Sequence, residues 1–100
     1  MNTSILVMED DTSIQELIVE FLKAEGYDVD FASDGLEGIQ LFKKKEYDLV
    51  LLDIMMPKLD GMRTCLKIRE SRNIPIIFFM KTYRSIILLE LMDYLIYNIL

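Results

Sequence analysis

The stretch Ile5-Leu6-Val7-Met8-Glu9-Asp10-Asp11 decides the fold of this 100-residue chain. Four apolar residues end abruptly in three acids, a pattern typical of a short strand that is buried on both faces. A second stretch, Asp48-Leu49-Val50-Leu51-Leu52-Asp53, repeats the pattern and ends in a single acid. Strands of this kind occur mainly in parallel sheets that helices cover on both sides.

Helices are expected between these strands. Apolar residues recur at helical spacing after the first strand, at Ile14, Leu17, Ile18, Phe21 and Leu22. Thr12 and Gln15 form a capping-box signature at the start of this helix, and Gly26 stands where a C-terminal cap belongs. The pattern predicts an amphipathic helix with one face on the sheet.

The remaining chain continues the alternation of strands and helices. We expect strands over 27–32, 47–52 and 76–79, a second helix from the Ser33-Asp34-Gly35 turn to about Lys44, and a third helix from about Gly61 to Glu70. Such alternation predicts an α/β, doubly wound parallel sheet in one domain. Ligands of such sheets bind beyond the carboxyl ends of the strands.

Composition and charge narrow the classes of function. The hydrophobic fraction of 52% argues against disorder, and the net charge of -6 argues against direct contact with nucleic acid by this segment. The chain has no histidine, which excludes a histidine triad, and its single cysteine, Cys65, is expected to be a small buried hydrophobe in a reducing compartment. With no secretory signal near the start, we expect a cytoplasmic protein that does not enter a membrane.

Three acids are the candidate functional residues. Glu9 and Asp10 end the first strand and Asp53 ends the third, so neighbouring strands would bring their carboxylates together. Taken singly, an acidic run can simply favour a helix N-terminus, and an aspartate after a strand can simply form a turn. Together they would repel one another unless a cation intervenes, and oxygen ligands favour Mg²⁺ over zinc or copper. Such a site suits phosphoryl transfer to Asp53, with the backbone carbonyl of Met55 as a further ligand.

At this point the residues resemble a known family. The two strand motifs, the Ile54-Met55-Met56-Pro57 and Lys58-Leu59-Asp60-Gly61 segments, and the spacing of Asp34-Gly35-Leu36-Glu37 are similar to response-regulator receiver domains, closest to those of winged-helix transcriptional regulators. The resemblance covers residues 3 to about 79. It implies a flavodoxin-like sheet in strand order 2-1-3-4-5 and a non-enzymatic phosphoprotein of two-component signal transduction that can dephosphorylate itself slowly.

The resemblance also implies roles for individual residues. Asp53 would accept a phosphoryl group from a sensor histidine kinase, while Glu9, Asp10, Asp53 and the Met55 carbonyl would bind Mg²⁺. Regulation of transcription would then pass through an output domain that these 100 residues do not contain.

The C-terminal part departs from the family pattern. Met80 occupies the place of the expected Thr or Ser at the end of strand four, and Thr82 would serve only if the strand bulges. Tyr97 and Asn98 stand in place of the expected Lys and Pro. We therefore identify no switch residue, and the coupling of phosphorylation to a change of shape is in question.

Residues 80–100 are atypical, with an incomplete or altered final strand and no final helix. A missing helix would expose apolar sheet surface, so we expect self-association through residues 80–100. A truncated or frame-disturbed receiver and a specialised tail both explain this segment. The apolar run falls short of the roughly 20 residues that a membrane span requires, and Glu90 and Asp93 interrupt it.

Three alternatives remain beside a signalling receiver. A degenerate receiver would act only as a protein-interaction module. A magnesium-dependent phosphatase of the haloacid-dehalogenase kind would also use an aspartate nucleophile, but it needs a second Asp where this chain has Met55. A flavodoxin-like cofactor binder is disfavoured, because no glycine-rich phosphate loop follows the first strand.

Overall fold

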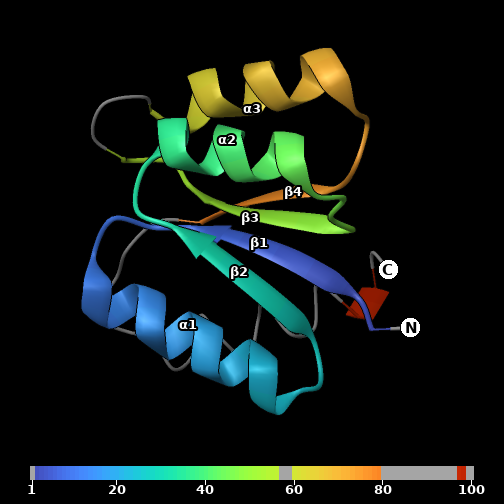
Figure 1. The fold of residues 1–100 in the computed structure, drawn as a ribbon. Helices are drawn as coiled ribbons and strands as arrows, with labels where there is room; N and C mark the ends of the chain where they lie inside the picture. The colour runs from blue at the N-terminus through green and yellow to red at the C-terminus, as the bar shows by residue number, and fades with distance from the viewer. Residues whose placement is uncertain (1, 57–59, 80–96, 99–100) are drawn as a thin grey trace.

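The computed structural model describes residues 2–56, 60–79 and 97–98. Within these residues, seven elements follow one another: β1 (Ser4–Met8), α1 (Thr12–Ala24), β2 (Asp28–Ala32), α2 (Gly35–Lys44), β3 (Leu49–Asp53), α3 (Gly61–Ser71) and β4 (Ile76–Phe79). The four strands form one parallel sheet in the order β2-β1-β3-β4. Figure 1 shows α1 on one face of the sheet and α2 and α3 on the other. The predicted doubly wound α/β fold is confirmed.

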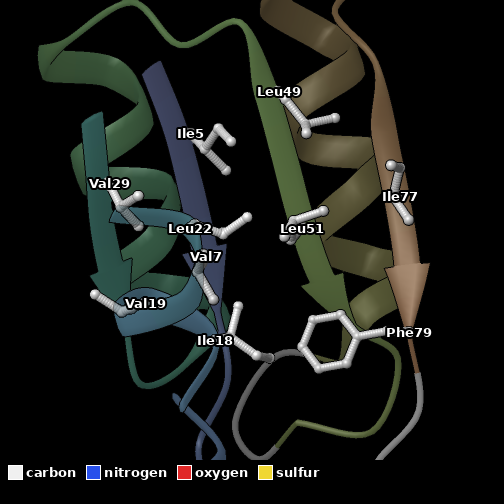
Figure 2. Packing of buried hydrophobic residues seen from close by; sticks show 10 residues of the cluster. All are labelled: Ile5, Val7, Ile18, Val19, Leu22, Val29, Leu49, Leu51, Ile77 and Phe79. Carbon is white, nitrogen blue, oxygen red and sulfur yellow. The ribbon is translucent and has the colours of Figure 1, made fainter. Parts of the chain in front are cut away.

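Alternation along the strands divides the core into two apolar clusters. In β1 and β3, residues Ile5, Val7, Leu49 and Leu51 face α1, whereas their chain neighbours face α2 and α3. Figure 2 shows the first cluster, in which Ile18 and Leu22 of α1 lie against the strands and Ile77 and Phe79 extend it onto β4. The second cluster consists of Leu6, Met8, Ala32, Phe42, Tyr47, Val50, Leu52, Met56 and Ile68. Because both faces of the sheet are covered, the strands can be almost continuously apolar.

The start of α1 differs from the sequence prediction. Asp11, rather than Thr12, is the N-cap, and its carboxylate accepts a hydrogen bond from the Ile14 amide at 3.1 Å. The Gln15 side chain does not close a capping box but points to the strand ends. An aspartate caps a helix at least as well as threonine, so the third acid of the run displaces Thr12 from that role. The C-terminal cap was predicted correctly, since Gly26 has a φ of 94°.

Aspartates cap the other two helices in the same way. Asp34 accepts a hydrogen bond from the Glu37 amide at 2.8 Å, and Asp60 accepts one from the Arg63 amide at 2.9 Å. Each cap follows a strand end or its loop and turns the chain back over the sheet. The N-termini of all three helices therefore lie on the side of the molecule where the strands end.

A polar contact joins elements at the opposite end of the sheet. The Tyr47 hydroxyl donates to Asp30 at 2.7 Å, and the Lys45 ammonium lies 3.1 Å from the same carboxylate oxygen. The hydrogen bond from Tyr47 lowers the pKa of Asp30, and Lys45 lowers it further. Burial, together with the bond to Asp30, raises the pKa of Tyr47. This contact links β2, the end of α2 and the entry to β3.

Several sequence predictions concern the C-terminal segment. Those for a fifth strand, for the absence of a final helix and for self-association through residues 80–100 lie largely outside the described residues, as do those for Met80 and Thr82. Tyr97 is described, and 81% of it is exposed. Cys65, expected to be buried, is only half-buried against the second cluster, because Thr64 and Ile68 take the innermost positions of α3.

Candidate functional site

The register of β1 against β3 brings the predicted acids together. Met8 lies opposite Leu52, so the next residues, Glu9 and Asp53, follow side by side at the carboxyl edge of the sheet. Asp53 is paired in turn with Phe79 on β4. Glu9 and Asp53 are both 0% exposed, while Asp10, one residue further along, is half-buried. Two buried carboxylates and one accessible carboxylate therefore share one end of the fold.

The three carboxylates are close enough to share a cation. Glu9, Asp10 and Asp53 each offer an oxygen, and these oxygens all lie within 4.8 Å of one another. Opposite ligands of one magnesium ion are about 4 Å apart, because each metal–oxygen distance is about 2.0–2.1 Å. A donor set made only of carboxylate oxygens suits a hard dication and not a soft metal. The chemistry of these residues therefore fits Mg²⁺, and oxygens up to 4.8 Å apart need to approach one another by less than about 1 Å to share the ion.

Backbone amides orient two of these carboxylates. The Asp11 amide donates to Glu9 Oε1 at 2.9 Å, and the Met55 amide donates to Asp53 Oδ1 at 2.9 Å. Hydrogen bonds to a charged acceptor are stronger than neutral ones. Each bond comes from the residue two positions further along the chain, so the turn that leaves each strand also positions the acid that ends it.

Gln15 belongs to the surroundings of the site, and the sequence analysis assigned it only to a cap. Its amide nitrogen donates to the backbone carbonyl of Glu9 at 2.9 Å and to that of Ala32 at 3.3 Å. Gln15 is 6% exposed, so these bonds form away from water. The side chain thereby fixes the end of β1 against the end of β2. The sequence signal that could have marked it is its helical spacing, because Gln15 lies three positions before Ile18 and seven before Leu22 and so on the apolar face of the helix.

Gly61 is a second residue whose role the sequence analysis did not identify. A Cβ atom at this position would lie 2.6 Å from the Asp53 carbonyl oxygen and 2.6 Å from Ile54 Cα, which no side chain tolerates. The Gly61 amide also donates to the Ile54 carbonyl at 3.3 Å. The first turn of α3 thus lies directly against the backbone that carries Asp53, and only glycine permits this approach.

The other predicted site residues are placed as follows. Met55 follows Asp53 by two positions and is 69% exposed. The described contacts do not test its carbonyl as a ligand, which stays a prediction. Asp11, the third acid of the run, caps α1 and does not join the other three.

These observations place the chain in a class of proteins that have a doubly wound parallel sheet with a group of acids at its carboxyl edge, and comparison with known proteins identifies the family. Residues 5–99 match the family described as the response regulator receiver domain. The chain is 51% identical over 72 residues to the transcriptional regulatory protein YcbL of Bacillus subtilis. The aligned region covers 72% of this chain and 32% of that protein. It is 43% identical over 72 residues to the alkaline phosphatase synthesis transcriptional regulatory protein PhoP of the same organism, and that aligned region covers 72% of this chain and 30% of PhoP.

Solved structures give the same fold. A CheY-like receiver domain protein from Methanospirillum hungatei superposes with a TM-score of 0.81 at 23% identity, over 94% of this chain and 93% of that one. The chain therefore belongs to the response regulator receiver domain family. It spans about a third of the length of the curated relatives that it matches. In the described part of the chain, no helix has both the length and the apolar character needed to cross a bilayer.

Proposed function

We propose that this domain accepts a phosphoryl group on Asp53 from a sensor histidine kinase, with Mg²⁺ held by Glu9, Asp10 and Asp53. The observation that supports the proposal is the convergence of the three carboxylates, within 4.8 Å, at the carboxyl edge of the sheet. The family and the names of the curated relatives support a role in transcriptional regulation through an output domain. The domain is then a phosphoacceptor and not an enzyme with turnover of its own.

In the transfer step, a carboxylate oxygen of Asp53 forms a bond to phosphorus as the bond from phosphorus to the kinase imidazole nitrogen breaks. The electron pair of the broken bond stays on that nitrogen, and the product is an acyl phosphate on Asp53. Bound Mg²⁺ would neutralise the charge that gathers on the phosphoryl oxygens. The Met55 amide holds Asp53 in place through Oδ1, and Gln15 holds the backbone of Glu9.

Acetyl phosphate provides a direct test because it needs no kinase. Its phosphoryl group would pass to Asp53 as acetate leaves. We expect intact-mass spectrometry to show one added phosphoryl group in the wild type with Mg²⁺, and none in Asp53→Asn or in the presence of EDTA. Asp60→Asn is the matched control, because Asp60 is an exposed helix cap outside the carboxylate group.

Three results would contradict the proposal. Equal labelling of Asp53→Asn would remove Asp53 as the acceptor. Binding of a partner protein without any labelling of the wild type would instead favour the degenerate interaction module. Rapid turnover of phosphate esters, with phosphate release in excess of protein, would favour the phosphatase, although Met55 stands where that class needs its second aspartate.

A further inference from the structure

A hollow of about 330 Å³ lies between α1 and the edge strand β2, apart from the acidic site. It is lined by Gln15, Glu16, Val19, Glu20 and Phe31. Phe31 is 48% exposed, whereas Val19 is buried. The hollow therefore has an apolar floor and an acidic rim. We call it the α1/β2 groove.

The acidic rim has a regular spacing. Glu16 and Glu20 are one helical turn apart on α1, and both are exposed. Residues four apart on a helix are neighbours on its surface, about 6 Å apart. A partner that matched this rim would carry two cations at the same spacing beside an apolar strip.

The exposed face of α3 has this chemistry. Arg63 and Lys67 are one turn apart and exposed, and Met62 and Leu66, also one turn apart, are 54% and 65% exposed. The only ion pair recorded for Arg63 within the described residues is to Asp60, 3.9 Å away and well exposed, so it contributes little. Glu70 reduces the positive charge further along the helix but does not lie between these two cations.

One molecule cannot use both surfaces on itself. The α1/β2 groove is on the face of the sheet that α1 covers, and α3 lies on the opposite face (Figure 1). We propose that the groove binds α3 of a second copy, with Arg63 and Lys67 against Glu16 and Glu20, and Met62 and Leu66 against Val19 and Phe31. This contact is heterologous, so a pair keeps one free helix on one copy and one free groove on the other, and further copies can add head to tail.

The proposal goes beyond phosphoryl acceptance and does not depend on it. Glu16, Glu20, Arg63 and Lys67 are outside the carboxylate group that would hold Mg²⁺. It also differs from self-association through residues 80–100, because it uses only described residues of α1, β2 and α3. The two origins of self-association can therefore be separated by substitution.

The test uses two neutralised variants of the full chain, Glu16→Gln/Glu20→Gln and Arg63→Gln/Lys67→Gln, with sedimentation velocity over a range of concentrations at low salt. We expect the wild type to form dimers and larger species, and each variant alone to associate at least about tenfold more weakly. An equimolar mixture of the two variants retains one intact groove and one intact helix. We expect it to form a 1:1 complex with nearly the wild-type affinity and no larger species.

Controls match the change in charge. Glu25→Gln/Glu46→Gln removes two exposed acids elsewhere, and Lys43→Gln/Lys44→Gln removes two exposed cations on α2; both should associate as the wild type does. The proposal is overturned if the wild type stays monomeric at millimolar concentration, or if the mixture associates no better than either variant. Association that is equally strong in both variants would also overturn it and would leave residues 80–100 as the origin.

Discussion

Gln15 connects the first turn of α1 to the strand ends that carry the acids. It is the donor to the Glu9 carbonyl, and the hydrogen-bonded amide is buried. Replacing it by methionine keeps the length and volume of the side chain but leaves that carbonyl without this donor. The net contribution of one buried hydrogen bond is about 0.5–1.5 kcal/mol. We expect Gln15→Met to lower the free energy of unfolding by that amount in urea titrations followed by circular dichroism.

The exposed Gln40 on α2 provides the control for this substitution. Gln40→Met should change stability by less than about 0.5 kcal/mol. If the two substitutions cost the same, the hydrogen bonds of Gln15 contribute nothing specific. Because Gln15 positions the Glu9 backbone, Gln15→Met should also weaken Mg²⁺ binding, and Gln40→Met should not.

The acids and Gln15 show what sequence can predict at the scale of a residue. Glu9, Asp10 and Asp53 were predicted because each follows an apolar strand, and parallel neighbours end at the same edge. The contact of Gln15 with Ala32 spans 17 positions and depends on β2 lying beside β1. Gly61 likewise depends on how closely α3 approaches β3. Such contacts follow from packing, which the local pattern does not encode.

At the scale of elements, Tyr47 and Asp30 provide a pH-dependent link between β2 and the entry to β3. The pKa of Asp30 is lowered by the hydrogen bond from Tyr47. The contribution of the ionised Asp30 to the free energy of unfolding is therefore present above about pH 4 and is lost as pH falls below that value. The pKa of Tyr47 is raised by burial and by Asp30. The contribution of the protonated Tyr47 hydroxyl to the free energy of unfolding is therefore present below about pH 10 and is lost as pH rises above that value. The contact is therefore strongest between these limits.

Tyr47→Phe should remove this stabilisation. We expect a loss of about 1 kcal/mol near pH 7, below the roughly 1.5–3 kcal/mol of a buried bond to a charged acceptor, because Asp30 is partly exposed. The difference from the wild type should shrink below about pH 4 and above about pH 10. Urea titrations across this range measure it, with Tyr97→Phe as the control, since 81% of Tyr97 is exposed. A difference that does not vary with pH would show that ring packing, not the hydroxyl, is responsible.

The elements themselves were largely predictable. Runs of apolar residues predicted the strands. Apolar residues three and four positions apart predicted α1, because burial of one face of a helix imposes that period. The helix starts were less predictable: α2 begins at the expected Ser33-Asp34-Gly35 turn, but at α1 Asp11 took the place of the Thr12 and Gln15 pair. Asp11 and Thr12 are both good caps in isolation, and in the structure Gln15 contacts the strand ends instead of closing a capping box with Thr12.

At the scale of the whole molecule, the same topology that builds the core concentrates negative charge. Parallel strands covered on both faces all end at one edge, and the acids that follow β1 and β3 meet there in a chain of net charge -6. Close carboxylates repel one another when no cation is bound. The fold therefore carries a site that costs stability, which is the usual relation between functional sites and stability.

Asp10→Asn tests this relation, because Asp10 is the accessible member of the three carboxylates. In EDTA we expect it to raise the free energy of unfolding by about 1 kcal/mol, well below the roughly 4 kcal/mol of two unit charges 4 Å apart at an effective dielectric constant of 20. Mg²⁺ at ten times its dissociation constant should stabilise the wild type by about 1.4 kcal/mol. The variant should gain little, so Mg²⁺ should reverse the order of the two stabilities.

The control is Asp60→Asn, at an exposed helix cap. It should change the free energy of unfolding by the same amount in EDTA and in Mg²⁺. If Mg²⁺ stabilises Asp10→Asn as much as the wild type, Asp10 does not hold the ion, and calorimetric titration of the two proteins would show equal affinity.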